Sequence, residues 1–562
     1  MATTLRSSGE PPKPPAPPTP TSTGAAGPVR TAGRATLLVM AFVLLSRVLG
    51  VVRSMALGNV FGQNATTDIY IRAFAVPDMI YLLMAGGALS TVFVPVFTKY
   101  TSDGDESGAW QALGRIATLV GVVVAGVILV FEIAAPWLAR LAAPAFSDTA
   151  VAQMVPMIRI LLPAQWFFFV GGLLIATLQA RGRFFIASLG PIIYNAAIIA
   201  GALSQAGRPN PDVSAMTWGA LIGAGAGNFL LPLWDLLRSG GRIPLGLDLK
   251  HPGVRRFLEL LLPAMLGLGL SQLGFLITGF FLGEGGALSA LRNGYELTQA
   301  PIGIFAQASA IVLFPAISLL AAKADWPAFR REVHHGIRRI LFLTVPASLL
   351  MSLLAEPIIR TLWPRFSAQE VADAADALRL YSIGTFAWSA QAVLGRGFFA
   401  QQDTKTPLAI TKFMIVLFTA LCAISTFVLH AGLIGLALSM SVVAMVSMGA
   451  FLAALARKVG DLDIRAMTFA TLRIFAAATI STVVAFFALD GAERLLPLSS
   501  SGRGGALVVV VTAGLVGIAA YAVACLLLRV PELKTVRALF RRSPAAAAPA
   551  ASASDTTPDT AA

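Results

Sequence analysis

The chain has 562 residues, of which 56% are hydrophobic and only 12% are charged, and its mean hydropathy is +0.77. Soluble globular domains carry about 25% charged residues, so this composition excludes a soluble protein and predicts a polytopic membrane protein. The net charge of +14 does not predict nucleic-acid binding, because the basic residues are scattered through short connections and not gathered in one module.

Both ends of the chain are low in complexity. Residues 1–34 include PPKPPAPPTPTSTG and are too polar and proline-rich to pack, so we predict a disordered cytoplasmic tail. This segment is not a secretory signal, because the apolar run that starts near Ala35 continues as a full membrane span. Residues 543–562 are expected to form a second disordered tail.

Between the tails, apolar runs long enough to cross a bilayer recur about fourteen times, since each crossing needs roughly 20 apolar residues. Their predicted centres lie near residues 47, 85, 122, 166, 195, 223, 269, 305, 349, 388, 418, 444, 479 and 517. Basic residues such as Arg181 and Arg183 gather in alternate connections, whereas most connections of the opposite set together hold one, Arg208. Two others, around 365–379 and 490–503, mix acids with arginines. The positive-inside rule then predicts that both termini are cytoplasmic.

An internal repeat is visible in the sequence. ALSTVFVP at 88–95 aligns with ASAIVLFP at 308–315, and RFFIASLG from Arg183 aligns with DTKTPLAI from Asp403, both at an offset of 220. Two matches at one offset indicate a duplicated unit of six spans whose copies enter from the same side. Chance similarity between apolar segments is the alternative. We predict a first lobe, a second lobe and an extra helix pair, at residues 35–240, 255–458 and 466–530.

Ionisable residues within the spans are costly in lipid and normally face a cavity or a partner. The first, second and eighth spans hold most of this set, which comprises Arg47, Arg53, Asp68, Arg72, Asp78, Arg159, Arg292, Glu296 and Arg396. Arg292 and Glu296 are four residues apart and can pair on one helix face, so a structural salt bridge is an alternative to cavity lining there. We expect Asp68, Asp78 and Arg396 to snorkel to the membrane interface.

Arg47 and Arg53 lie mid-span, six residues apart, or about 240° around an ideal helix. They would share a face only if the helix bends, and Gly50 between them would permit a local break. We expect both arginines to line a water-filled cavity. Several guanidinium groups in one cavity suit an anion, and arginine's planar fork matches phosphate, so a phosphate or diphosphate head group is the predicted ligand.

Enzymatic chemistry is not predicted. The sequence has no Walker loop, no GxSxG motif and no paired carboxylates flanking a pocket, so transport explains the pattern with fewer assumptions. Cys422 and Cys525 lie inside apolar runs, and the four histidines form no HExxH motif. We therefore expect no disulfide, no metal site and no cofactor.

Six stretches together resemble the successive motifs of the MurJ (MviN) lipid II flippase family, within the multidrug/oligosaccharidyl-lipid/polysaccharide (MOP) exporter superfamily. They are SRVLGVVR (46–53), FGQNATTDIYIRAFAVPD (61–78), GALSTVFVPVFTKY (87–100), RFFIASLGPIIYN (183–195), QAPIGIFAQASAIVLFPAIS (299–318) and GFFAQQDTKTP (397–407). The resemblance runs from about Ala35 to the last span.

This resemblance implies an all-α polytopic membrane fold of fourteen helices. Two pseudo-symmetric six-helix lobes would surround a central cavity, and two extra C-terminal helices would form a groove for the lipid tail. It also implies alternating-access movement of lipid II, an undecaprenyl-diphosphate-linked peptidoglycan precursor, from the inner to the outer leaflet of the bacterial plasma (inner) membrane.

The resemblance also assigns residues. Arg47 and Arg53 match the family's two first-helix arginines, which face the cavity, and Asp68 matches its TD aspartate. We predict substrate binding by Arg47, Arg53, Arg72, Arg292 and Glu296. We predict a conformational or structural role for Gly50, Asp68, Pro77, Arg183, Asn195, Asp403 and Lys405.

The chain departs from the family members with the fuller charge set. They carry a lysine, an arginine and a glutamate where this chain has Ala75, Leu82 and Gly86. In the eighth span, their arginine and following glutamate correspond here to Glu296 and Gln299. Arg72 and Arg292 are candidates to restore cationic character from nearby positions.

These departures leave two alternatives open: a flippase for another polyprenyl-linked glycan, and a scaffold that recruits cell-wall enzymes without transporting anything. The expected partners are lipid II and membrane lipids, with cell-wall synthesis proteins as further candidates. We expect no nucleic-acid partner, and we expect the chain to act as a monomer.

Overall fold

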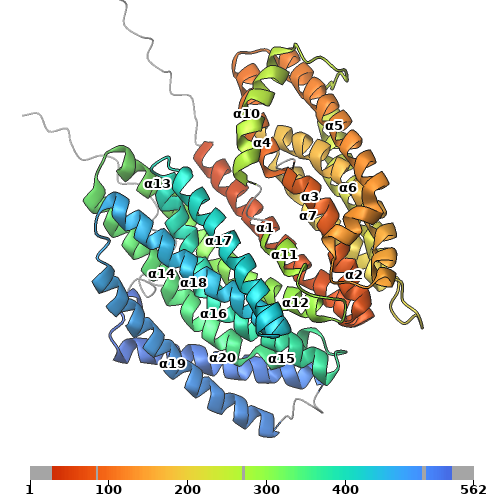
Figure 1. Ribbon diagram of the computed structural model, residues 1–562. Coiled ribbons are helices and arrows are strands. Elements are labelled where there is room, and N and C mark those ends of the chain that lie inside the picture. The colour runs from red at the N-terminus through yellow and green to blue at the C-terminus, as the bar shows by residue number, and fades with distance from the viewer. Residues whose placement is uncertain (1–27, 84–85, 269–272, 496–501, 534–562) are drawn as a thin grey trace, which may run out of the picture.

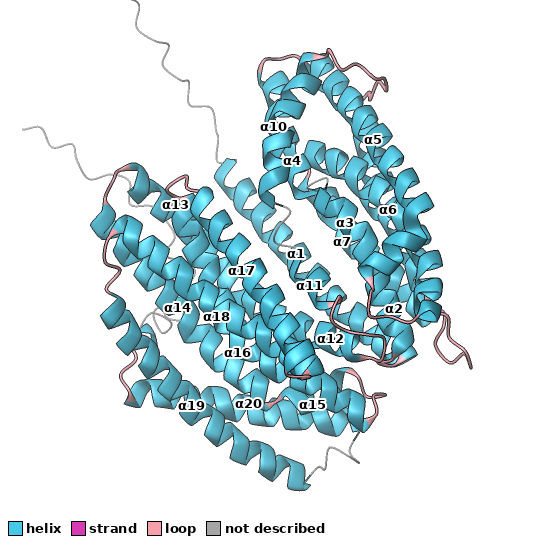
Figure 2. Cartoon of the chain, viewed as in Figure 1, coloured by secondary structure: helices cyan, strands magenta, loops and turns pink. Residues whose placement is uncertain are grey.

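A computed structural model of the chain describes residues 28–83, 86–268, 273–495 and 502–533. These residues form helices joined by short connections, and no strand occurs among them (Figure 2). The tail expected at 543–562 and most of the one expected at 1–34 lie outside the described residues. The expected tail extends too far, since residues 28–34 belong to the first helix, which begins at Pro28. Proline is tolerated there, since the N–H that it lacks would have no partner in the first turn of a helix.

The helices follow one another in three groups along the chain. The first half contains α1 (Pro28–Phe61), α2 (Ala65–Ala73), α3 (Ala75–Leu83), α4 (Gly86–Ser102), α5 (Glu106–Ala142), α6 (Asp148–Ala180), α7 (Phe184–Leu203), α8 (Ser214–Gly223), η1 (Ala224–Leu230) and α9 (Leu231–Arg238). The second half contains α10 (Pro252–Leu268), α11 (Leu273–Thr278), α12 (Ala287–Pro301), η3 (Ile302–Gln307), α13 (Ala308–Ala322), α14 (Trp326–Leu353), α15 (Ala355–Leu362), α16 (Ala368–Phe399), α17 (Lys405–Ala423), η4 (Ile424–Val428) and α18 (Gly432–Val459). The last pair is α19 (Ile464–Leu495) and α20 (Gly502–Leu527).

Ten helical segments of the described chain are long and apolar enough to cross a membrane. The other expected spans are the second, seventh, eighth and tenth. The second is divided into α2, α3 and α4, the seventh into α10 and α11, and the eighth into α12, η3 and α13, whereas the tenth, α16, is one continuous but less apolar helix. Interrupted helices occur at membrane depth only where protein or a water-filled cavity covers them. The second and eighth spans, which hold many of the charged candidates, are therefore expected to be covered.

Prolines account for two of these interruptions. Pro77 cannot donate to the carbonyl of Ala73, which is the residue where α2 ends. Pro301 is the last residue of α12, and the π-helical turn η3 follows it directly. A proline inside a helix removes one hydrogen bond of the ladder and commonly produces such irregular turns.

The backbone repeats the duplicated unit in the same register as the sequence. Asp105 caps α5, and Asp325, at the equivalent position of the second copy, caps α14, each by accepting a hydrogen bond from the N–H three residues further on. Ser147 and Ser367, which are equivalent in the same way, cap α6 and α16. Chance similarity between apolar segments does not account for polar cap residues at equivalent positions. The caps therefore support a repeat in the fold itself.

Helices of each half pack chiefly on one another (Figure 1). In the first half α1 packs on α7 and α5 on α6, and in the second half α16 packs on α14 and α18. The seventh span is shared, since α10 packs on α4 and α5 while α11 contacts α17. The last pair, α19 and α20, packs together and against α14 and α15.

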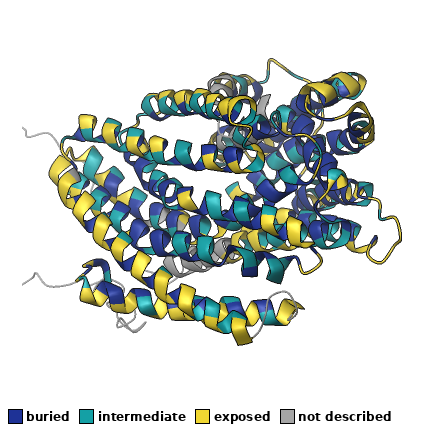
Figure 3. Cartoon of the chain, turned by 60° about the horizontal axis from the view of Figure 1, so that its bottom comes forward, coloured by how far each residue is buried: buried dark blue, intermediate teal, exposed yellow. Residues whose placement is uncertain are grey.

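The outer surfaces of the bundle are apolar. Large side chains are exposed on α5, α17, α19 and α20, for example Ile133 (75%), Val416 (66%), Phe487 (67%) and Leu515 (62%). Figure 3 shows that exposed positions run along the outer faces of the helices. Such broad apolar exposure is unusual for a soluble monomer and is typical of helices that face lipid. The polar features of interest therefore lie between the helices.

Candidate functional site

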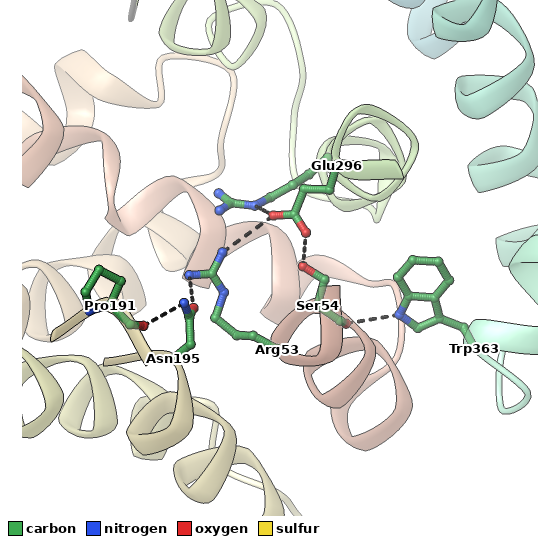
Figure 4. A network of polar contacts seen from close by, with 7 residues as sticks. Arg53, Ser54, Pro191, Asn195, Glu296 and Trp363 are labelled. Carbon is green, nitrogen blue, oxygen red and sulfur yellow. Dashed lines mark hydrogen bonds and ion pairs between the residues drawn. The ribbon is translucent and has the colours of Figure 1, made fainter. Parts of the chain in front are cut away.

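Arg53 connects the two halves of the chain (Figure 4). Its Nη1 donates to Asn195 Oδ1 on α7 at 3.1 Å, and Asn195 Nδ2 donates to the carbonyl of Pro191 at 2.9 Å. Its Nη2 forms an ion pair with Glu296 Oε1 on α12 at 3.6 Å. The guanidinium is thus held by an amide of its own half and by a carboxylate of the other.

Glu296 is the common partner in this network. Arg292 Nε donates to Oε1 at 3.1 Å, which is the pairing expected from their spacing along the helix. The Ser54 hydroxyl donates to Oε2, and Trp363 Nε1 donates to the Ser54 carbonyl at 3.0 Å. The side chains of Arg53, Glu296 and Arg292 are only 22%, 19% and 28% exposed, so water screens their charges less than it would at an open surface.

Arg47 lines a second part of the interface between α1 and α12. Its Nη1 donates to the carbonyl of Gln299 at 3.4 Å, and a cavity of about 220 Å³ is lined by Arg47, Gly50, Glu296 and Gln299 among others. The local break that Gly50 would permit does not occur, because α1 is helical from Pro28 to Phe61. One glycine costs a helix only about 1 kcal/mol, which the surrounding helical hydrogen bonds outweigh. A Cβ built at Gly50 would contact nothing within 4 Å, so this residue leaves the cavity wall open.

A larger cavity, of about 380 Å³, lies between the halves and is walled by α2, α3, α6, α7, α11 and α12. Its charged lining residues are Arg72, Asp78 and Arg292, and Ala75, Pro77 and Tyr194 also line it. Asp78 therefore faces this cavity rather than the membrane interface, because the second span turns that side of α3 inward. Since Arg292 lines this cavity and Glu296 lines the smaller one, their ion pair lies where the two cavities approach each other.

Arg72 is 1% exposed, and its guanidinium N–H groups donate hydrogen bonds to backbone carbonyls of the protein. Its Nε donates to the carbonyl of Ala142 at 2.6 Å, and its Nη1 donates to that of Leu276 at 3.1 Å. The guanidinium also lies 5.2 Å from the ring centre of Phe280. Ala142 is the last residue of α5, whose carboxyl end carries a partial negative charge that favours a cation. Substrate contact by Arg72 remains a prediction.

Asp68 lies at the junction of α2 with the start of α12. It is fully buried, and its carboxylate accepts hydrogen bonds from the N–H groups of Gly285 (3.2 Å), Gly286 (2.6 Å) and Ser289 (2.7 Å) and from the Ser289 hydroxyl (2.7 Å). The expectation that Asp68 snorkels is wrong, because four donors at the amino end of α12 satisfy this carboxylate inside the protein. Asp68 therefore joins the first half to the second.

Two ion pairs occupy equivalent connections of the two halves. Arg183, before α7, donates from Nε to Asp235 Oδ2 at 2.7 Å. Asp403, before α17, accepts from Lys458 Nζ at 2.6 Å and from the N–H groups of Lys405 and Thr406 at 3.0 Å. Burial alone would raise the pKa of Asp403, but the hydrogen bonds from Lys458 and Thr406 outweigh it and hold the pKa below its usual value. Lys405 thus contributes its backbone here.

Sequence reasoning missed several of these partners, namely Ser54, Trp363, Asp235 and Lys458. The two pairing partners had a signal in the sequence. Asp235 and Lys458 end the sixth and twelfth spans with charges opposite to those of Arg183 and Asp403, respectively. Ser54 and Trp363 had none, because a serine beside an arginine and a tryptophan near a helix end are common. In the described part of the chain, no cluster of three or more His, Cys, Asp or Glu side chains could hold a metal ion.

Comparison with known sequences identifies the family. The sequence profile described as "Lipid II flippase MurJ" matches residues 57–494. The chain is 32% identical over 431 residues to the probable lipid II flippase MurJ of Vibrio cholerae, covering 74% of this chain and 81% of that protein. It is 30% identical over 389 residues to the lipid II flippase MurJ of Burkholderia cenocepacia, covering 67% and 75%.

Solved structures share the fold. A lipid II flippase MurJ in an inward closed conformation superimposes with a TM-score of 0.70 at 20% identity, over 90% of this chain and all of that one. An inward-facing multidrug resistance MATE family transporter of the MOP superfamily gives 0.63 at 16% identity, over 74% and 95%. The sequence matches show that the chain belongs to the lipid II flippase MurJ family, a family of transporters and not of enzymes, and the solved structures show that it has the same all-α, multi-pass membrane fold.

Proposed function

We propose that the chain moves lipid II from the inner to the outer leaflet of the bacterial plasma membrane, with its diphosphate held by the cavity arginines. The observation that carries this proposal is the convergence of Arg53 and Arg292 on Glu296, beside cavities that Arg292 and Glu296 line between the halves. Guanidinium groups match phosphate oxygens and can bind them in pairs. Membership of a family named for this substrate favours lipid II over other anions.

Contacts between the halves support alternating access. Asp68 binds the start of α12, the N–H of Gln63 donates to Glu370 Oε1 at 2.6 Å, and the N–H of Ser147 donates to Glu284 at 3.1 Å. All three contacts lie on the side opposite to the arginine-rich connections, which by the positive-inside rule are cytoplasmic together with both termini. The outer side is then closed in this state, and these contacts must break before the substrate can leave outward.

The remaining parts take roles that fit this cycle. The lobes at 35–240 and 255–458 rock against each other as a monomer, and the pair at 466–530, which packs on α14 and α15, guides the polyprenyl tail. Pro77 interrupts the second span where it lines the cavity, and Arg183, Asn195, Asp403 and Lys405 stabilise the helices that move.

The test is translocation of lipid II by the purified full chain in lipid vesicles. The unchanged chain should move lipid II, and Arg53→Ala should reduce the rate at least tenfold at equal reconstitution. The matched control is Arg159→Ala, because Arg159 pairs with Glu132 at 3.9 Å within the first half, away from the other half. Failure of the unchanged chain to move lipid II, while it moves a different polyprenyl-diphosphate glycan, would transfer the assignment to that substrate.

A cellular test gives an independent readout. In a strain depleted of its lipid II flippase, the unchanged chain and Arg159→Ala should restore growth, whereas Arg53→Ala should not at the same protein level. Growth supported equally by Arg53→Ala would contradict a role for that guanidinium in the head-group site.

A further inference from the structure

We infer that Glu296 is an internal counter-anion: its carboxylate occupies Arg53 and Arg292 until the substrate's diphosphate displaces it. This inference rests on the proposed function only in taking the ligand to carry a diphosphate. Its basis is the convergence of three donors from two helices on one carboxylate, namely Arg53 and Ser54 from α1 and Arg292 from α12. The oxygens of Glu296 therefore already stand where anionic oxygens are bound.

The charges favour exchange over permanent pairing. Arg53 and Arg292 share the one carboxylate of Glu296, and Arg47 adds a third guanidinium group at the same α1–α12 interface. Asp78, which lines the larger cavity with Arg292, is the other anion near them, so three cations face two anions. A diphosphate offers more charge and more acceptor oxygens than one carboxylate, so it can satisfy both arginines at once. It cannot stay beside Glu296 without repulsion between like charges, and the carboxylate must move away from the arginines.

The surroundings allow this exchange. Arg292 lines the cavity of about 380 Å³, and Glu296 lines the cavity of about 220 Å³, so the ion pair can be reached from open space on both sides. The three charged side chains are each between 19% and 28% exposed, which leaves them accessible yet poorly screened. Arg53 has a second partner in Asn195, so it remains positioned when Glu296 leaves.

Displacement of Glu296 also changes how the halves are linked. Glu296 ties α12 to α1 through the ion pair with Arg53 and the hydrogen bond from Ser54. When the diphosphate takes over the arginines, these side-chain ties are lost. Substrate binding thereby weakens one contact between the halves, and a ligand that changes such a contact shifts the balance between conformations. Glu296 is in this sense a positioning residue for the transport cycle.

The first experiment measures binding of inorganic diphosphate to the purified full chain by calorimetry. Glu296→Gln preserves the size of the side chain and removes its charge, so affinity should rise about tenfold because the internal competitor is gone. Glu132→Gln is the matched control, since it removes an intramembrane carboxylate that pairs with Arg159 within the first half, and it should not change the affinity. Unchanged or weaker binding by Glu296→Gln overturns the inference, because a carboxylate that merely oriented the arginines would be needed for binding.

A second variant keeps the test informative if Glu296→Gln does not fold. Ser54→Ala retains the carboxylate and removes one of its hydrogen bonds, so it should raise diphosphate affinity by a smaller factor, about threefold. Ser54 is buried, and the loss of one hydroxyl leaves the carbonyl that Trp363 binds unchanged. Affinity equal to or below that of the unchanged chain would contradict the inference.

The second experiment measures whether diphosphate changes the distance between the two halves. Spin labels at exposed Val43 on α1 and exposed Leu319 on α13 report the distance between them, after replacement of Cys422 and Cys525. Diphosphate should shift the distance distribution of the unchanged chain, and Glu296→Gln should show the shifted distribution without diphosphate. A Glu296→Gln distribution equal to that of the ligand-free unchanged chain would overturn the inference.

These outcomes are separate from the fate of the proposed function. If the unchanged chain does not move lipid II in vesicles but Glu296→Gln tightens diphosphate binding, the proposed function is wrong and the inference about Glu296 holds. If the unchanged chain moves lipid II but Glu296→Gln does not bind diphosphate more tightly, the inference about Glu296 is wrong and the proposed function holds.

Discussion

Asp105 and Asp325 occupy equivalent positions of the two halves and cap α5 and α14 with nearly the same backbone angles, φ −89° and ψ 74° in one and φ −81° and ψ 75° in the other. Arg183 and Asp403 are equivalent in the same register, yet they carry opposite charges. Each of these two side chains pairs with a residue of opposite charge at the end of the sixth or the twelfth span. The two halves thus share the geometry of these helix starts and differ in the sign of the charge at the position of Arg183 and Asp403.

The comparison shows which features a duplicated fold must keep. A helix start needs a side-chain acceptor for its free N–H groups, and only a few residue types supply one, so aspartate and serine recur at the caps. Pro95 and Pro315 likewise recur inside α4 and α13. An ion pair works with either sign, so its partners can be exchanged together without loss of the contact.

The charged residues at the junction between the halves are not repeated at equivalent positions of the two copies. Asp68 has Leu288 at the equivalent position of the second half, and the network around Glu296 joins α1 of one half to α12 of the other. The site is therefore asymmetric within a symmetric frame. The residue types needed at such a junction depend on the ligand and on the contacts with the other half, and not on the helix that carries them.

The largest effect is expected from Asp68→Asn, which breaks the junction between the halves. An amide cannot replace a buried carboxylate that accepts four hydrogen bonds, so the free energy of unfolding should fall by about 2–3 kcal/mol. Thermal unfolding in detergent measures this, with Asp105→Asn as the control, because asparagine caps helices about as well as aspartate. Equal melting temperatures for the two variants would show that Asp68 contributes no more than a cap.

Replacement of the serine caps tests the similarity of the halves. Ser147→Ala and Ser367→Ala should each lower the free energy of unfolding by about 1 kcal/mol. The effect should be larger at Ser367, because its capping box includes Glu370, which also accepts a hydrogen bond from Gln63 of the first half. The same unfolding measurement checks both, and a larger loss from Ser147→Ala would contradict the role of Glu370.

Exchange of charges tests the difference between the halves. Arg183→Ala and Asp403→Ala should each lower stability by about 0.5–1 kcal/mol, since Arg183 and Lys458 are nearly half exposed and solvent screens both pairs. Reversal of the first pair, Arg183→Asp with Asp235→Arg, should restore most of the loss and give that half the sign of the other. A double-mutant cycle measures the coupling, and zero coupling would mean that the pairs are incidental.

The smallest effect expected is the pH dependence of the Asp403 contact. Its pKa is depressed below the usual value of 3.8, so its contribution is present above pH 3.8 and is lost as the pH falls through the folded-state pKa. The difference in melting temperature between the unchanged chain and Asp403→Asn should therefore shrink on acidification. Ser147→Ala, whose hydroxyl does not titrate, should differ from the unchanged chain by the same amount at each pH, and a constant difference for Asp403→Asn would contradict the shift.

The fold was largely predictable from the sequence, and the site only partly. Fourteen apolar runs and a repeat at one offset gave the helical membrane class, and the ten long apolar segments and matching caps agree with them. Arg292 with Glu296 followed from helix spacing. The burial of Asp68 and the unbroken course of α1 at Gly50 did not follow, since both depend on what packs against those residues.

The sequence by itself determined the membrane class, the duplicated unit and the helix ends, because these depend on apolar length, on local hydrogen bonds and on residues close together in the chain. Only the tertiary structure decided that Arg53 meets Glu296 and that Asp68 meets the amino end of α12. These contacts join residues that lie in different halves and far apart in the chain. Their existence depends on how two complete halves pack, which no local pattern records.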